Sequence, residues 1–166
     1  MILKILGICI FMYICVKVSY DYKLQLKNRY EYVAGIINGL KFLKKEISLF
    51  STFLGEALVL SSEYAGKADL LFKSAGEKII KDPSYNLGDL FESETTNKDL
   101  KVCLIMKQLG SQLGTGDTEN EELIIKSAVN KLEILYNEYL NNYETKGRLI
   151  NKIGVVSAIF ISIIIM

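Results

Sequence analysis

Apolar residues crowd both ends of the chain, and between the ends they recur at helical spacing. The first apolar run extends without a charge from Ile5 to Val16 and is followed by Lys17. At a rise of about 1.5 Å per residue, a helix over residues 1–18 spans about 27 Å, close to the hydrocarbon thickness of a bilayer. The pattern predicts a transmembrane helix at 1–18. A cleaved signal peptide is the alternative, but the following KVSYD segment lacks an A-x-A-like cleavage site.

The closing run, IGVVSAIFISIIIM, predicts a second membrane span. Residues 153–166 give about 21 Å of helix, and counting from Leu149 gives about 27 Å when Lys152 extends its amine to the membrane interface. The alternative is a buried core helix, but the run has no polar face. We therefore expect three parts: an N-terminal transmembrane helix (1–18), a cytoplasmic helical bundle (19–148) and a C-terminal transmembrane helix (149–166).

Basic residues next to the two apolar runs predict the orientation of the chain. On the inner side of the runs lie Lys17, Lys23, Lys27, Arg29, Lys146, Arg148 and Lys152. Only Lys4 and the terminal amine lie on the other side. The positive-inside rule then places both termini outside the cell and the central domain in the cytoplasm. The predicted localisation is the cell membrane, crossed twice.

The middle of the chain has helical periodicity throughout. One apolar seam with alternating steps of three and four comprises Val33, Ile36, Leu40, Leu43, Ile47 and Phe50. Thr52 is the predicted N-cap of a second helix over residues 53–64. Gly66 starts a third helix over residues 67–80. The residues of this helix that we expect to face a core are Leu70, Leu71, Ile79 and Ile80.

Punctuating residues separate the remaining helices. Residues 82–84 (Asp-Pro-Ser) stop the third helix, and a short helix is expected at 87–94. Thr96 or Asn97 caps the next helix, which ends at Leu109 with Gly110 as its C-cap, and the last helix begins after Asp117. No segment alternates apolar and polar residues, so the fold class is all-α, with about six helices. If these helices form paired hairpins, the two halves should resemble each other weakly.

The glycine-rich stretch LGSQLGTGDTENEEL, residues 109–123, raises the question of a nucleotide site. A P-loop needs a Gly-Lys-Ser/Thr sequence after a strand, and here the lysine and the strand are both missing. A corner between two helices explains the same residues. Gly110 takes a positive φ, Gly116 turns the chain, and Asp117 or Thr118 caps the next helix. Glu121 completes a capping box with Thr118.

The composition argues against an enzyme. Histidine is absent, the formal net charge is +1, and the cysteines are Cys9, Cys15 and Cys103, for which we expect small buried side chains. Acids one or two positions apart, such as Glu92 with Glu94 or Glu121 with Glu122, point in different directions on a helix and cannot share a site. We predict no catalytic residue, no cofactor site and no metal site. A generic two-span helical membrane scaffold is the alternative function.

Three segments resemble the stage III sporulation protein AB family. Residues 109–117 match an LGxxLGxxD signature, residues 43–47 with 52–58 match LExEI and TPLxEAL segments, and residues 146–149 with Gly154 open the last span. Phe53 stands where that family usually has proline. Glu121 and Glu122 stand where a glutamine commonly follows the aspartate.

The resemblance implies a non-enzymatic membrane protein of endospore-forming bacteria, acting in the mother cell as part of a channel complex with the forespore. The family is similar to the platform proteins of type II secretion, which implies a cytoplasmic secretion-type ATPase as partner. Other membrane proteins of the complex and a second copy of the chain are further possible partners. No nucleic acid is expected as a partner. A docking surface is hypothesised at Glu46, Thr52, Glu56, Leu109, Gly110, Leu113, Gly114 and Asp117. The alternative is that Thr52, Glu56 and Asp117 only cap helices. The stripe Tyr136, Tyr139 and Tyr143 on the last helix is expected in a core, with an interface as the alternative.

Overall fold

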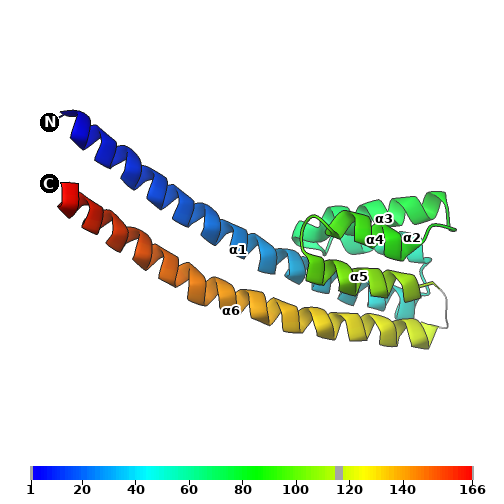
Figure 1. Ribbon diagram of the computed structural model, residues 1–166. Coiled ribbons are helices and arrows are strands. Elements are labelled where there is room, and N and C mark those ends of the chain that lie inside the picture. The colour runs from blue at the N-terminus through cyan, green and yellow to red at the C-terminus, as the bar shows by residue number, and fades with distance from the viewer. Residues whose placement is uncertain (1, 115–117, 166) are drawn as a thin grey trace. The chain divides into compact units, whose positions relative to one another are not determined.

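The computed structural model describes the backbone of residues 2–114 and 118–165, and the side chains of residues 7, 10–11, 13–114, 119–150 and 156. Within these residues the chain is helical and has no strand, which confirms the all-α class (Figure 1). The described elements are α1 (Ile2–Phe50), α2 (Leu54–Ser62), the 3-10 helix η1 (Gly66–Ala68), α3 (Asp69–Lys81), α4 (Leu87–Thr95), α5 (Leu100–Gln112) and α6 (Thr118–Ile165).

The chain divides into two compact units, which are described separately. One unit, here called the paired-helix unit, combines residues 1–30 with residues 137–166 and holds the first part of α1 and the last part of α6. The other, here called the bundle, comprises residues 31–136. Many side chains of the predicted spans, 1–18 and 149–166, lie outside the described residues. Among the residues that the structure does describe, no helix is both long enough and apolar enough to cross a membrane.

Aromatic and basic side chains join the two helices of the paired-helix unit. The rings of Tyr30 and Tyr143 lie 5.2 Å apart between centroids, and the Lys23 amine lies 5.9 Å from the Tyr143 centroid. The Arg29 guanidinium lies 5.5 Å from the centroid of Tyr139, which is buried. The core position predicted for Tyr139 is therefore confirmed, whereas Tyr143 is only half-buried.

The apolar seam of α1 forms one wall of the bundle core. Val33, Ile36, Leu40, Leu43 and Ile47 are all buried, as their spacing predicted. The prediction is wrong for Phe50, which is 62% exposed. Phe50 is the last residue of α1, and the chain turns directly after it at Ser51, which has a φ of +50°.

Two helical hairpins, α2–α3 and α4–α5, complete the core. In each hairpin a pair of glycines allows the two helices to approach closely. A Cβ on Gly76 of α3 would lie 2.7 Å from the carbonyl oxygen of Gly55 in α2, and one on Gly110 of α5 would lie 2.6 Å from the amide nitrogen of Gly88 in α4. The first helix of each hairpin has 9 residues and the second has 13. Both pairs of helices thus form hairpins in which backbone meets backbone.

The third predicted helix is displaced at its start. Gly66 opens the 3-10 turn η1, and α3 begins only at Asp69. Leu71 and Ile79 are buried as expected, but Leu70 and Ile80 are 66% and 49% exposed, so that part of the prediction is wrong. The residues that face inward from α3 are Leu71, Phe72, Ala75 and Ile79, at helical spacing. Each wrongly placed residue directly neighbours one of these and points about 100° away from it.

The cap of α5 also differs from the expectation. Asp99 caps the helix, because its carboxylate accepts hydrogen bonds from the amides of Lys101 and Val102 at 2.9 and 3.4 Å. Thr96 instead donates its hydroxyl to the Glu92 carbonyl of the preceding helix, and Asn97 is exposed. The short helix predicted at 87–94 is confirmed to within one residue.

The cysteines only partly follow the prediction of buried side chains. Cys103 is buried at 3% exposure, with its sulfur near the Glu92 carbonyl oxygen. Cys15 is half-exposed, because it lies on the part of α1 that precedes the bundle. The side chain of Cys9 lies outside the described residues.

Candidate docking site at the end of the bundle

The two acids of each neighbouring pair considered as catalytic groups bind different partners. Glu92 pairs with Lys107 at 2.7 Å, whereas Glu94 pairs with Lys78 at 3.7 Å. Glu121 accepts from the Gly114 amide, whereas its neighbour Glu122 pairs with Lys44. Neighbouring acids on one helix therefore do not converge, as their spacing predicted. Within the described residues, no cluster of histidine, cysteine or acidic side chains could hold a metal ion.

Gly110 does not end a helix, contrary to the prediction. It lies inside α5, which continues to Gln112, and the residue in the C-cap position is Leu113. A side chain at Gly110 would meet the backbone of Leu87 at 2.7 Å and the amide of Gly88 at 2.6 Å. Gly110 is therefore needed for the close approach of α5 to the start of α4.

The chain turns after α5 at Gly114. Gly114 has a φ of +80°, in the left-handed region that favours glycine. Its amide donates to the Glu121 carboxylate, with 2.9 Å between nitrogen and oxygen. Glu121 therefore holds this turn against the first part of α6. The predicted capping box would instead bond the Glu121 side chain to the backbone at Thr118. Residues 115–117 lie outside the described residues, and the predictions for Gly116 and Asp117 fall there.

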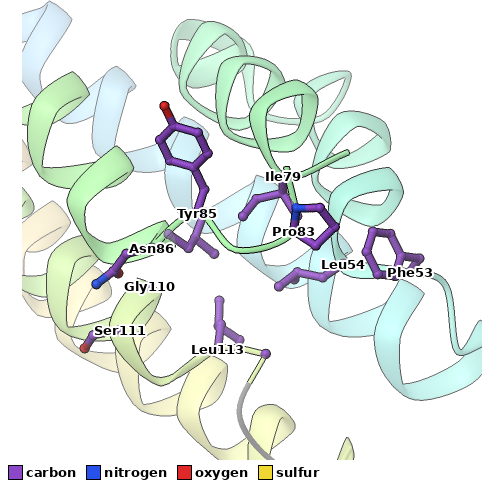
Figure 2. A pocket seen from close by; sticks show the side chains of 11 residues that line it. Phe53, Leu54, Ile79, Pro83, Tyr85, Asn86, Gly110, Ser111 and Leu113 are labelled. Carbon is purple, nitrogen blue, oxygen red and sulfur yellow. The ribbon is translucent and has the colours of Figure 1, made fainter. Parts of the chain in front are cut away.

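A pocket of about 370 Å³ opens beside this turn (Figure 2). Three connections of the bundle meet around it: the start of α2, the loop between α3 and α4, and the end of α5. Figure 2 shows Leu54, Ile79 and Pro83 on one side of the pocket and Asn86 and Ser111 on the other. The lining residues are Phe53, Leu54, Ile79, Pro83, Tyr85, Asn86, Leu87, Gly110, Ser111, Leu113 and Gly114. None of them carries a charge.

The start of α2 supplies Phe53 and Leu54. The predicted cap is wrong by one residue: Phe53 holds the N-cap position and makes no side-chain hydrogen bond there. Thr52 turns back to α1, where its hydroxyl donates to the Glu46 carboxylate at 3.0 Å. The Phe53 side chain is 54% exposed at the pocket.

The loop between α3 and α4 supplies Pro83, Tyr85 and Asn86. Ser84 donates from its amide and its hydroxyl to the Asp82 carboxylate, and these bonds lower the pKa of Asp82. Asn86 caps α4 by accepting from the Gly88 amide at 2.9 Å. Tyr85 is thus held between two fixed turns, 53% exposed, with its hydroxyl directed away from Leu113 (Figure 2).

The structure brings together part of the predicted docking residues. Gly110, Leu113 and Gly114 line the pocket, and a Cβ on Gly114 would touch Leu54 at 3.4 Å. Leu109 is buried in the core instead. Glu46 and Thr52 bond to each other beside the pocket, and Glu56 is exposed in the first turn of α2.

The sequence reasoning missed the residues contributed by the α3–α4 loop and others from the helices beside it. The lining residues that were not predicted are Phe53, Leu54, Ile79, Pro83, Tyr85, Asn86, Leu87 and Ser111. The Asp-Pro-Ser segment was interpreted only as a helix stop. Tyr85 directly follows this segment, and its position is the sequence signal for an exposed aromatic side chain in the loop.

The comparisons with known proteins give one match. The family model of stage III sporulation protein AB matches residues 4–166, nearly the whole chain. Neither the curated proteins nor the solved structures contain a match.

Proposed function

Because the chain belongs to the stage III sporulation protein AB family, we propose that it is a platform component of the mother cell–forespore channel complex. In this role it docks a cytoplasmic secretion-type ATPase to the membrane during endospore formation. Membership of the family gives the chain a sporulation-related role, and the family is not a known enzyme family. The protein would act by contact and not by chemistry.

Attachment to the mother-cell membrane is supported by the sequence of both ends. The apolar runs at 5–16 and 153–166 carry no charge, and lysines and arginines gather on their inner sides. Tyr13 and Tyr20 are exposed on either side of Lys17. Tyrosine and lysine are the side chains that favour the headgroup region of a bilayer. The central residues would then lie in the cytoplasm, where an ATPase can reach them.

The observation that carries the docking proposal is the meeting of two motif segments at one pocket. Gly110, Leu113 and Gly114 come from the LGxxLGxxD segment, and Leu54 comes from the segment similar to TPLxEAL. These segments are far apart in the sequence, yet they line one exposed cavity, and none of its described lining residues carries a charge. Apolar and aromatic side chains of this kind are enriched at the centre of protein interfaces.

The test is co-purification of the intact, tagged protein from membranes of sporulating cells, followed by a search for a secretion-type ATPase of the same cells in the purified material. We expect the ATPase in the membrane fraction when the protein is present and in the soluble fraction when its gene is deleted. An ATPase that distributes identically in both strains contradicts the docking function. Labelling of the central residues from outside intact cells by an impermeant reagent contradicts the orientation.

A further inference from the structure

We propose that the pocket binds a partner segment in which an apolar side chain is flanked by lysine or arginine residues. The inference rests on the proposed docking function and names the chemistry of the segment that docks. Two features of the described residues carry it: an uncharged pocket with exposed aromatic side chains, and an excess of carboxylates around that pocket.

The interior of the pocket suits one apolar anchor. Its walls include Leu54, Ile79, Pro83 and Leu113, and its volume of about 370 Å³ accommodates a leucine or phenylalanine side chain. Phe53 and Tyr85 are both more than half exposed at its edge. Exposed aromatic residues around an apolar depression are typical of the centre of a protein interface, where a few anchors carry most of the binding free energy.

Acidic residues outnumber lysines among the residues that adjoin the pocket lining in the sequence or bond to it. Within the described part of the chain, we define the acidic rim as the acids that lie within two positions of a lining residue or bond to one: Glu56, Glu77, Asp82, Asp89 and Glu121. The lysines that meet the same criterion are Lys78 and Lys81. Lys78 already pairs with Glu94. The rim therefore has a net negative charge.

The charge of this rim can select the charge of a partner. The hydrogen bonds from Ser84 hold the pKa of Asp82 below its usual value, so this carboxylate is charged. Charges at the edge of an interface steer association and reject partners of like charge, while the apolar centre supplies affinity. A basic partner segment with an apolar anchor satisfies both parts of the surface.

The experiment uses the full chain in phosphatidylcholine nanodiscs, whose zwitterionic surface does not attract basic peptides. Three fluorescein-labelled peptides serve as probes: Lys-Lys-Phe-Leu-Lys-Lys, the same anchor flanked by glutamates, and the lysine peptide with alanines in place of the anchor. Fluorescence anisotropy reports binding. We expect the first peptide to bind at least about tenfold more tightly than the other two. Its affinity should fall as added salt screens the charge of the rim.

Matched variants assign the binding to the pocket and its rim. The double variant Phe53→Ala/Tyr85→Ala, at two exposed positions, should lower the affinity for the first peptide by at least about tenfold. The double variant Glu56→Gln/Asp89→Asn should also lower this affinity and reduce its dependence on salt. The controls Glu63→Gln and Asp69→Asn remove exposed acids beyond the far end of α2 and should leave binding unchanged, as should Leu100→Ala.

The outcomes separate this inference from the proposed function. If the ATPase co-purifies with the membrane but the glutamate-flanked peptide binds as tightly as the lysine-flanked one, the inference is wrong and the docking function stands. Equal effects of the rim and control variants also overturn the inference. If the lysine-flanked peptide binds as expected but the ATPase does not co-purify, the surface chemistry is supported and the ATPase is the wrong partner.

Discussion

The backbone amide of Gly114 donates a hydrogen bond to the carboxylate of Glu121 across the α5–α6 connection, with 2.9 Å between the two atoms. This bond joins a residue that lines the pocket to the start of a 48-residue helix. Glu121 is half-buried as a residue, whereas the bond itself is exposed to solvent, so the bond makes a modest contribution to stability.

Removing this carboxylate should loosen the turn. We expect Glu121→Ala to lower the free energy of unfolding by about 1 kcal/mol, because the Gly114 amide loses a charged acceptor. Hydrogen exchange at Gly114 should accelerate in the variant. Glu119→Ala, which removes an exposed acid from the same turn of α6, is the control and should change neither quantity. Equal behaviour of the two variants would show that the bond does not hold the turn.

Gly110 should tolerate no side chain. A Cβ there would lie 2.6–2.7 Å from the backbone of Leu87 and Gly88, which cannot rotate away. We expect Gly110→Ala to lower the free energy of unfolding by about 1–3 kcal/mol, followed by chemical denaturation of the intact protein.

The matched control for this substitution is Gly147→Ala. A Cβ at Gly147, inside α6, would meet only the Lys23 side chain, at an ordinary contact distance of 3.7 Å. Since alanine favours a helix interior, this variant should be stabilised by about 0.5–1 kcal/mol. A Gly110→Ala variant as stable as the wild type would mean that α4 and α5 do not meet at these glycines.

The helices and their buried faces were predictable where the spacing of apolar residues is helical. The buried seam of α1 follows directly from the spacing of Val33, Ile36 and Leu40, and Pro83 marks the stop of α3. Caps were less predictable, since Thr96, Asn97 and Asp99 can all accept from a helix amide. Only the backbone conformation decides between them, and Asp99 has the extended φ that an N-cap requires.

The candidate site was less predictable than the fold because it is made by packing. Gly110 was interpreted as a helix terminator, since a glycine near the end of an apolar pattern usually is one. Its actual contact, with the start of α4, depends on which helices pair. Tyr85 and Phe53 come from loops whose exposure no periodicity encodes. The structure places Gly110, Leu113 and Gly114 of the motif at the pocket, and the opposite wall could not be predicted from the sequence.

Stability should depend on Tyr32 at alkaline pH. Burial, with a smaller effect of the Glu94 charge, raises the pKa of Tyr32 from 10.0 to about 12, and the Lys98 amine lies 4.7 Å from the ring centroid. Its hydroxyl is buried and has no hydrogen-bond partner among the residues that the structure describes. The folded protein therefore keeps the proton to a higher pH than the unfolded chain. The stability present below pH 10 is lost as the pH rises from 10 toward about 12.

The variant Tyr32→Phe isolates this effect. It removes both the unpaired hydroxyl and the titration, so it should be at least as stable as the wild type at neutral pH. Its melting temperature should fall less than that of the wild type between pH 9 and pH 11, since other groups titrate equally in both proteins. Identical pH profiles for the two proteins would contradict the burial of this hydroxyl.

The most direct test of the central claim, that this protein acts by docking a partner at the pocket, is the affinity of the secretion-type ATPase for the full chain in nanodiscs. The wild type is compared with Phe53→Ala/Tyr85→Ala at the pocket and with Leu100→Ala/Leu104→Ala, two exposed apolar residues of α5 that do not line it. We predict binding weakened at least about tenfold by the first pair and unchanged by the second. Equal affinity of all three proteins for the ATPase, with unchanged melting temperatures, would contradict the account.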